Sequence, residues 1–115
     1  MKPTKKISLR GYNGKYLLIK VKDLVYCKSS ANYTEYHTTD GNMHVGNYNI
    51  AHTANKLPTH LFFRVRRELL VNVNHIVHYH NDGSLLLTNG FTCTIAIRNL
   101  KEFQEFIKTH YYIMP

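Results

Sequence analysis

Acidic residues, cysteines, prolines and tryptophan are scarce in this sequence of 115 residues, which has seven Asp and Glu, two Cys, three Pro and no Trp. Because fifteen Lys and Arg stand against those seven acids, the formal net charge at pH 7 is +8. A basic excess of this size favours a polyanionic partner, either nucleic acid or an anionic membrane surface. It does not distinguish specific binding from the general attraction that any basic surface exerts.

Long hydrophobic runs are also absent. No stretch approaches the roughly 18 apolar residues that a membrane-spanning helix requires, and no apolar region follows Met1–Thr4 as it would in a secretory signal peptide. We therefore expect neither a membrane partner nor export. The length predicts one domain over residues 1–115, with a core at about 5–110 that needs no disulfide or metal for its stability.

The two cysteines, Cys27 and Cys93, lie far apart, each in an apolar, strand-like run. Two cysteines do not make the disulfide framework on which small secreted domains depend. Reduced, buried thiols in a cytoplasmic protein are the interpretation we adopt, although the sequence leaves a disulfide between the two open.

The sequence patterns typical of enzymes and cofactor sites are missing. There is no Gly-rich phosphate loop of the P-loop or Rossmann type, and no obvious pair of carboxylates. Ser29, Ser30 and the two cysteines lack any recognised nucleophile context. We expect that the chain is not an enzyme and binds no cofactor.

Three histidines, His75, His78 and His80, lie close in sequence, and the last two would share one face of a strand. Their spacing matches no standard Cys/His zinc pattern. We expect ordinary surface or hydrogen-bonded histidines, with a histidine-dependent metal site as the alternative that metal analysis would test. Protonation of imidazoles near pH 6.5 would strengthen the attraction for a polyanion as the pH falls.

Most of the chain reads as short strand patterns separated by turn signals. Strands are expected at 5–9, 16–21, 24–27, 33–38, 43–45, 76–79, 85–87 and 92–97, in addition to the central stretch 62–76. Turns are expected at 11–14, 40–41, 81–83 and 89–90. Helical spacing predicts helices at 49–57, capped by Asn47 or Asn49 and stopped by Pro58, and at 100–110, capped by Asn99. The fold class is therefore mainly β, built from hairpins, with two short helices.

The central stretch carries an unusual cluster of arginines. Phe63 and Val65 alternate with Arg64 and Arg66, the pattern of a half-buried strand, and Arg67 follows at once. Unpaired guanidinium groups are too costly to bury, and few acids are present to pair with them, so they should emerge at one edge. A cluster of planar, multi-donor cations suits a polyanion. We expect a binding role for Arg66 and Arg67, and a structural partner or a phosphate for Arg64.

Two further places offer polar groups at exposed positions. Arg98, with Asn99 beside it, stands between the last strand and the second helix, where it can cap or pair locally or can reach a guanine edge in a major groove. The polar break at 29–34, which follows Lys28, is either a plain surface loop or a loop whose Asn, Ser and Thr groups contact bases or phosphates.

These features together resemble the LytTR-type DNA-binding domain of bacterial transcriptional regulators. The resemblance covers roughly residues 5–110, and its most specific part is Phe-Phe-Arg-Val-Arg-Arg-Glu-Leu-Leu-Val-Asn-Val-Asn-His-Ile at 62–76. Supporting matches lie at 25–26, 29–34, 40–41, 57–58, 89–90 and 97–101.

The resemblance implies an elongated arrangement of small antiparallel sheets, which binds double-stranded DNA by loops rather than by a recognition helix. In this family, loops enter two successive major grooves and the minor groove between them. Carried over by position, the loop with Asn32, Tyr33 and Thr34 would enter one major groove, Arg66 and Arg67 would lie near the minor groove, and Arg98 with Asn99 would enter the other major groove.

The chain departs from the family pattern at three positions. Arg66 stands where His is frequent, which adds charge, and Ile97 stands where Arg is frequent, which removes one DNA contact. Glu68 stands where Ser is frequent; because its carboxylate would repel a phosphate, we expect it to pair with an arginine or to face away.

The resemblance implies a sequence-specific transcriptional regulator, or its output domain, that binds a repeated DNA site as two copies. The chain has no room for the receiver domain common in this family, so we expect either an excised output domain or a naturally short regulator. A receiver domain or sensor kinase is then a partner in a longer native protein. The alternative, from another class, is a protein-interaction or sensory module whose basic surface has no specific DNA site.

Overall fold

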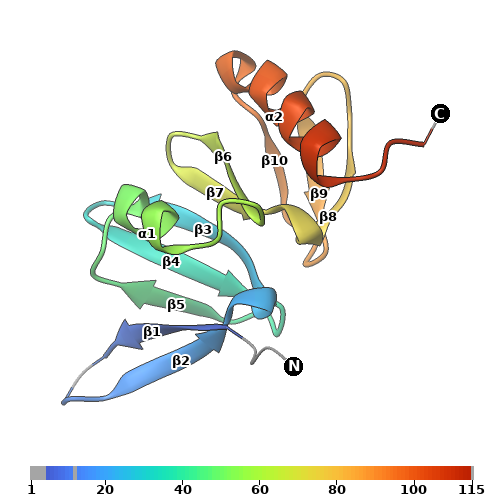
Figure 1. Ribbon diagram of the computed structural model, residues 1–115. Coiled ribbons are helices and arrows are strands. Elements are labelled where there is room, and N and C mark those ends of the chain that lie inside the picture. Colours follow the sequence, from blue (N-terminus) through green and yellow to red (C-terminus); the bar gives the residue numbers. More distant parts are fainter. Residues whose placement is uncertain (1–4, 12, 115) are drawn as a thin grey trace.

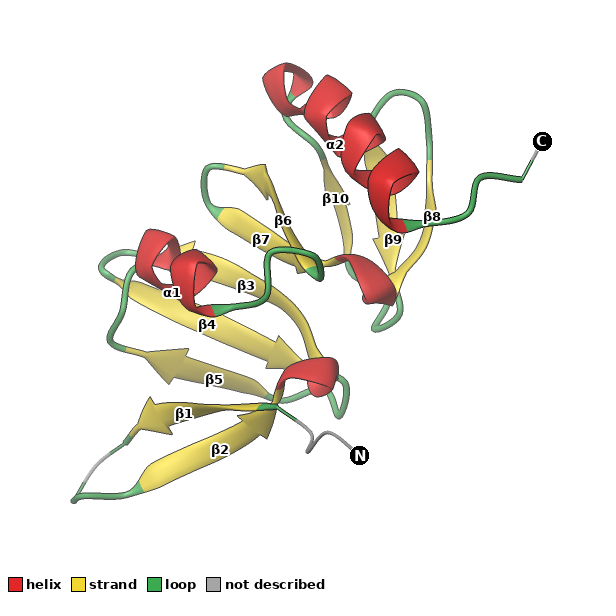
Figure 2. Cartoon of the chain, in the orientation of Figure 1, coloured by secondary structure: helices red, strands yellow, loops and turns green. Residues whose placement is uncertain are grey.

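The computed structural model describes residues 5–11 and 13–114, and within them the chain forms ten strands, two α-helices and two short 3-10 helices (Figures 1 and 2). The strands are β1 (Lys6–Arg10), β2 (Tyr16–Lys20), β3 (Leu24–Ser30), β4 (Tyr33–Thr38), β5 (Met43–Gly46), β6 (Phe62–Arg66), β7 (Leu69–Asn72), β8 (Ile76–Tyr79), β9 (Ser84–Leu87) and β10 (Thr92–Thr94). The helices are η1 (Val21–Asp23), α1 (Ile50–Lys56), η2 (Val73–His75) and α2 (Ile97–His110). The turn expected at 11–14 includes Tyr12, which lies outside the described residues.

The strands form three antiparallel sheets that follow one another along the molecule (Figure 1). A two-stranded sheet pairs β1 with β2, a five-stranded sheet has the order β5-β4-β3-β7-β6, and a three-stranded sheet has the order β10-β9-β8. The molecule measures 52 × 38 × 24 Å and is therefore elongated. The predicted fold class, an elongated and mainly β arrangement with two helices, is confirmed.

The central strands separate two hydrophobic cores. In β6, Phe63 and Val65 belong to the core that α2 covers, whereas Phe62 belongs to the core beneath α1. In β7, Val71 joins the first core and Leu70 the second. Because side chains alternate between the faces of a strand, a strand buried on both faces needs a continuous apolar run. This accounts for the apolar run Leu69–Val71 in β7.

The first helix agrees with its sequence signals. Asn49 is the N-cap, and its side chain accepts a hydrogen bond of 2.8 Å from the backbone N–H of His52. Helix α1 ends at Lys56, two residues before Pro58. None of the helices in the described part of the chain is long and apolar enough to cross a membrane.

The second helix begins earlier than the sequence predicts. The last strand ends at Thr94 rather than at 97. Beyond it, the backbone N–H of Ala96 bonds to β6 instead of to β9, donating to the carbonyl of Val65 at 2.9 Å. The N-cap of α2 is Ala96, so the prediction that Asn99 caps this helix is wrong. Asn99 instead lies in the first helical turn, where its N–H donates to the Ala96 carbonyl at 2.8 Å.

The polar break predicted after Cys27 is mostly strand. Strand β3 continues to Ser30, and Lys28, Ser29 and Ser30 pair with β4, so only Ala31 and the next residue turn the chain. Ala31 has a φ of 53°, in the left-handed region that tight turns use. Polar residues fit here because the backbone ladder, rather than side-chain burial, holds this end of the hairpin.

Candidate nucleic-acid interface

The predicted contact residues belong to three segments of the chain. These segments lie on the same side of the molecule, toward the left of Figure 1. They are the β3–β4 turn, the β6–β7 turn and the first turn of α2. The backbone N–H of Ser29 donates to the carbonyl of Glu68 at 2.9 Å and joins the first turn to the second. The bond from Ala96 to the carbonyl of Val65 joins α2 to β6. Backbone hydrogen bonds therefore fix the spacing of the three segments.

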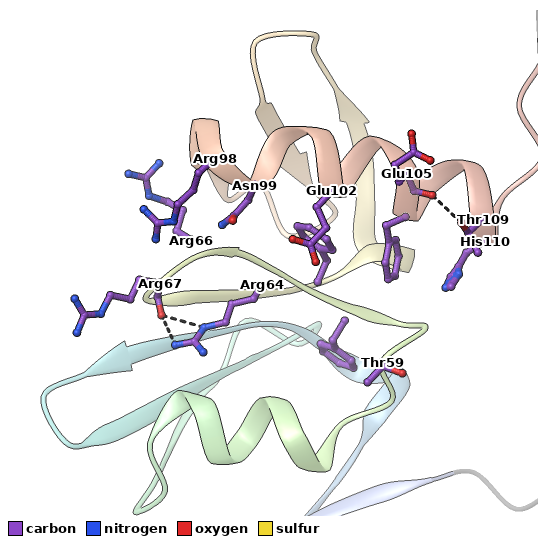
Figure 3. A pocket seen from close by; sticks show the side chains of 13 residues that line it. Thr59, Arg64, Arg66, Arg67, Arg98, Asn99, Glu102, Glu105, Thr109 and His110 are labelled. Carbon is purple, nitrogen blue, oxygen red and sulfur yellow. Dashed lines mark hydrogen bonds between the residues drawn. The ribbon is translucent and has the colours of Figure 1, made fainter.

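A groove of about 830 Å³ runs between the β6–β7 hairpin and α2 (Figure 3). Arg66, Arg67 and Arg98 gather at one end of it, and Glu102 and Glu105 stand toward the other (Figure 3). The positive charge is thus concentrated at the end of the groove that belongs to the shared side.

Arg64 fixes the conformation of the β6–β7 turn. Its Nε and Nη2 donate to the backbone carbonyl of Arg67 at 3.1 and 2.6 Å (Figure 3). A planar guanidinium that holds one oxygen through two donors restrains both its own side chain and the turn. The prediction of a structural partner for Arg64 is confirmed: the partner is the backbone carbonyl of Arg67. By holding this carbonyl, Arg64 fixes the position from which the Arg67 side chain projects.

Arg66 connects the central sheet to the three-stranded sheet. Its Nη1 donates to the hydroxyl of Thr94 at 3.0 Å and to the Thr94 carbonyl at 3.3 Å. Its Nε lies 3.9 Å from a carboxylate oxygen of Glu68, and both side chains are about half exposed, so this ion pair contributes little. No sequence pattern indicated Thr94 as a partner of Arg66, because the two residues are 28 positions apart.

Arg67 and Arg98 are exposed, and neither makes an ion pair or a side-chain hydrogen bond with residues 5–11 and 13–114. Arg98 is the second residue of α2, and a cation at this position opposes the helix dipole by roughly 0.3–1 kcal/mol. The same dipole attracts an anion, as the guanidinium does. A cation at this position therefore destabilises the isolated helix slightly. The same position favours binding of a phosphate or of an electronegative base edge.

Asn99 has a structural role in this arrangement. Its Nδ2 donates to the carbonyl of Val65 at 3.3 Å, and the side chain is half-buried. The amide therefore holds the first turn of α2 against β6 and positions Arg98. This bond uses one of the two N–H donors of the amide, so the predicted DNA contact of Asn99 stays a prediction.

In the first loop, two of the three side chains predicted to contact DNA are exposed. Asn32 and Tyr33 are exposed. Thr34 is fully buried, and its hydroxyl donates to the backbone carbonyl of Tyr48 at 2.7 Å. The predicted Thr34 contact is wrong for this side chain, because Thr34 lies on the inner face of β4 together with Tyr36.

Replacing Thr34 with valine tests this assignment. Valine has nearly the same shape but leaves the Tyr48 carbonyl without its partner, so the free energy of unfolding should fall by about 1–3 kcal/mol. Sequence preference for duplex DNA should not change. Urea unfolding and site selection from a random duplex pool measure the two quantities. The matched control is Asn32→Ala at the exposed turn, for which we expect altered DNA affinity and unchanged stability; the reverse pattern would contradict the assignment.

Comparisons with known proteins identify the family and the fold. The family model of the LytTr DNA-binding domain matches residues 14–108. The chain belongs to the LytTR DNA-binding domain family. Among solved structures, the chain is similar to the LytTr DNA-binding domain from a Bacillus cereus protein described as a methyl-accepting/DNA response regulator. The identity is 19%, the TM-score is 0.77, and the match covers 92% of this chain and 98% of that one. No curated protein sequence matches the chain.

Membership of the LytTR family decides the general function. LytTR domains are DNA-binding domains of transcriptional regulators rather than enzymes, so the partner of this LytTR domain is DNA. At 19% identity, the Bacillus cereus structure shows that the fold is shared and does not transfer individual contacts.

The cysteines of this LytTR domain are poor nucleophiles. Both are free, and burial raises the pKa of the Cys27 thiol to about 12 and that of the Cys93 thiol to about 11. Both thiols are therefore protonated at neutral pH, and the thiolate is the reactive form. Within the described residues, no group of three or more His, Cys, Asp or Glu side chains could hold a metal ion.

Proposed function

We propose that this LytTR domain binds a specific duplex DNA sequence in the bacterial cytoplasm and regulates transcription there. Three segments of one edge would enter successive grooves. The observation that carries the proposal is the position of Arg67 and Arg98. Both are exposed, both lack partners among the described residues, and both stand at the same end of the groove between β6–β7 and α2 (Figure 3).

Arg98 is the residue we assign to base reading. A guanidinium can donate two hydrogen bonds to O6 and N7 of guanine, which no other base pair accepts in the same geometry. To make both hydrogen bonds, Arg98 needs a rigid backbone support. Asn99 and Ala96 supply it, because their hydrogen bonds to Val65 and to each other fix the first turn of α2.

Arg67 is the residue we assign to the minor groove or its phosphates, with Arg66 beside it. Arg64 holds the carbonyl of Arg67, so the side chain projects from a restrained turn. The proposal also places the exposed Asn32 and Tyr33 of the β3–β4 turn in the second major groove. Each segment then contributes only a few DNA contacts, and specificity comes from a DNA sequence that satisfies all three segments at once.

Arg67→Ala should weaken binding to every duplex sequence by a similar factor. It should also reduce the slope of log Kobs against log salt concentration by about 1, because one phosphate contact is lost. Fluorescence anisotropy of a labelled duplex between 50 and 200 mM salt measures both. Lys108→Ala, in the last turn of α2, removes the same charge far from the turn and is the control. A loss at one base position alone would contradict the phosphate assignment.

Selection of binding sites from a random duplex pool tests the proposal as a whole. We expect a defined sequence to be enriched, and equal affinity for all duplexes would refute specific binding. We also propose that two copies bind a repeated site. Gel mobility shifts with one and two copies of the enriched sequence would reveal the stoichiometry, and one bound chain on the repeated site would refute this part.

Control of the output is the last part of the proposal. The similar domain from Bacillus cereus comes from a protein described as a response regulator. We infer that a receiver domain or a sensor kinase controls this LytTR domain in a longer native protein. Copurification of the native protein with a partner kinase, or phosphorylation-dependent DNA binding, would test the inference.

A further inference from the structure

Among residues 5–11 and 13–114, only one face of the three-stranded sheet β10-β9-β8 is covered, and helix α2 covers it. Helix α2 packs on that face through Phe103, which is fully buried and contacts Tyr79 edge-on at 5.3 Å between ring centroids. Leu85 and Leu87 point to the same side and are buried. The opposite face carries the side chains of His78, His80, Ser84, Leu86, Thr92 and Thr94.

The strand register arranges these side chains in two rows across the sheet. One row contains His80, Ser84 and Thr94, since Thr94 pairs with Ser84 and the N–H of His80 donates to the Ser84 carbonyl at 3.0 Å. The other contains His78, Leu86 and Thr92. Gly83, with a φ of +93°, closes the tight turn between His80 and Ser84. Adjacent strands lie about 4.8 Å apart, so each row spans about 10 Å.

This face begins where the proposed DNA interface ends. The Nη1 of Arg66 donates to the hydroxyl of Thr94, the last residue of the first row. Arg66, Thr94, Ser84 and His80 therefore form one continuous line from the central sheet across the small sheet. A DNA backbone that passes Arg66 would run onto this line rather than away from the protein.

The charges around the line favour a phosphate when the histidines are protonated. No carboxylate lines this face within the described residues. Asp82 and Glu68 stand at its two ends: Glu68 faces Arg66 at 3.9 Å, and Asp82 accepts hydrogen bonds from the N–H and hydroxyl of Ser84 at 3.0 and 2.8 Å. Those bonds, followed by the charge of His80, lower the pKa of Asp82, so its carboxylate stays ionised in mild acid. On the covered side of the sheet, Cys93 is half-buried and uncharged.

The geometry points to a second, pH-dependent surface for the DNA phosphate backbone, in which His78 and His80 contact phosphates beyond the grooves reached by Arg67 and Arg98. This assignment rests on the proposed DNA-binding function. The histidine rings lie 5.2 Å apart edge-to-face, so both can present a nitrogen to the same strand of DNA. Each DNA strand carries one phosphate per about 3.4 Å of helix axis, so a row of about 10 Å lying along that axis faces roughly three phosphates. Histidine is the side chain whose charge responds to mild acid, so this surface predicts DNA binding that depends on pH.

A divalent metal is the competing ligand for two neighbouring imidazoles. A stable protein site takes three or four ligands, and the described residues supply no third His, Cys, Asp or Glu here. The two ligands also predict opposite pH effects. Phosphate contacts strengthen as imidazole is protonated, whereas metal binding requires the neutral ring.

The test compares the wild-type LytTR domain with the double variant His78→Gln/His80→Gln, using anisotropy of a duplex enriched from a random pool. For the wild type, the slope of log Kobs against log salt should be steeper at pH 5.5 than at pH 8 by about 1–2. For the double variant, that pH-dependent steepening should disappear, while the affinity at pH 8 equals the wild-type value. His110→Gln, at the far end of the groove from the arginines (Figure 3), controls for general loss of a histidine.

The outcomes separate this inference from the function on which it rests. An unchanged pH response in the double variant, or the same loss in His110→Gln, overturns the phosphate surface and leaves DNA binding intact. Tighter binding at pH 8 that EDTA abolishes overturns it in favour of a metal. Absence of wild-type binding at pH 8 instead refutes the proposed function, because that function rests on Arg67 and Arg98 and not on the histidines. Circular dichroism at both pH values confirms that each variant is folded.

Discussion

Phe103→Ala should lower the free energy of unfolding by about 3–5 kcal/mol. The Phe103 side chain is fully buried and contacts Phe63 and Tyr79 edge-on, at 5.4 and 5.3 Å between ring centroids. Alanine would remove those contacts and leave a cavity between α2 and two sheets. Since whole domains are stable by only about 5–15 kcal/mol, urea unfolding should show a large shift in midpoint.

Phe103→Ala should also weaken specific DNA binding, even though Phe103 is buried. Arg98 stands at the start of the helix that Phe103 anchors, so a loose helix no longer holds the guanidinium in one place. Gln104→Ala, at the exposed neighbouring position, is the matched control and should change stability by less than about 0.5 kcal/mol. A loss below about 1 kcal/mol in Phe103→Ala would show that α2 is not packed as the structure has it.

Arg98→Ala should reduce affinity for the selected DNA site by about 1–3 kcal/mol, which is roughly a 5- to 150-fold loss. The loss should be confined to one base position. Without the guanidinium, the four base pairs at that position should bind almost equally, because the bidentate hydrogen bonds to guanine are gone. Site selection repeated with the variant identifies the position, and anisotropy with single-base substitutions gives the size of the effect.

Stability and binding should move in opposite directions in this variant. Removing a cation from the first turn of α2 relieves its repulsion from the helix dipole, so Arg98→Ala should unfold at an equal or slightly higher urea concentration than the wild type. Lys108→Ala removes the same charge from the last turn of the same helix, where a cation is favourable, and should leave base preference unchanged. If Arg98→Ala weakened binding to all sequences equally, Arg98 would be a phosphate contact and the base-reading role would be lost.

The two arginines of the interface depend on different supports. Arg67 is presented by a turn whose carbonyl Arg64 holds through two donors, whereas Arg98 is presented by a helix whose first turn is bound to Val65. A rigid scaffold of this kind lowers the conformational entropy lost on binding. The two supports use different contacts, so variants of Arg64 and Phe103 should affect different DNA positions.

Much of the fold was determined by local sequence. Alternating apolar residues and strong turn signals located the strands, because side chains on a strand alternate between faces and Gly or Asn favours tight turns. Asn49 and Pro58 likewise marked the limits of α1. The arginine cluster and the scarcity of acids predicted an exposed basic edge, because charge that has no partner inside a domain must lie at its surface.

Only the tertiary structure decided which of those polar side chains are exposed and which are held by other residues of the chain. Periodicity placed Thr34 and Tyr33 on opposite faces of β4, but which face is buried depends on α1 and the segment before it, and these bury Thr34. The role of Asn99 depends on the carbonyl of Val65, and that of Arg66 on Thr94, each about thirty positions away in sequence. Short-range patterns report the local period of the backbone, whereas burial and hydrogen-bond partners come from contacts between distant segments. That is why the arginine edge could be predicted from the sequence, while the individual tasks of its side chains required the folded chain.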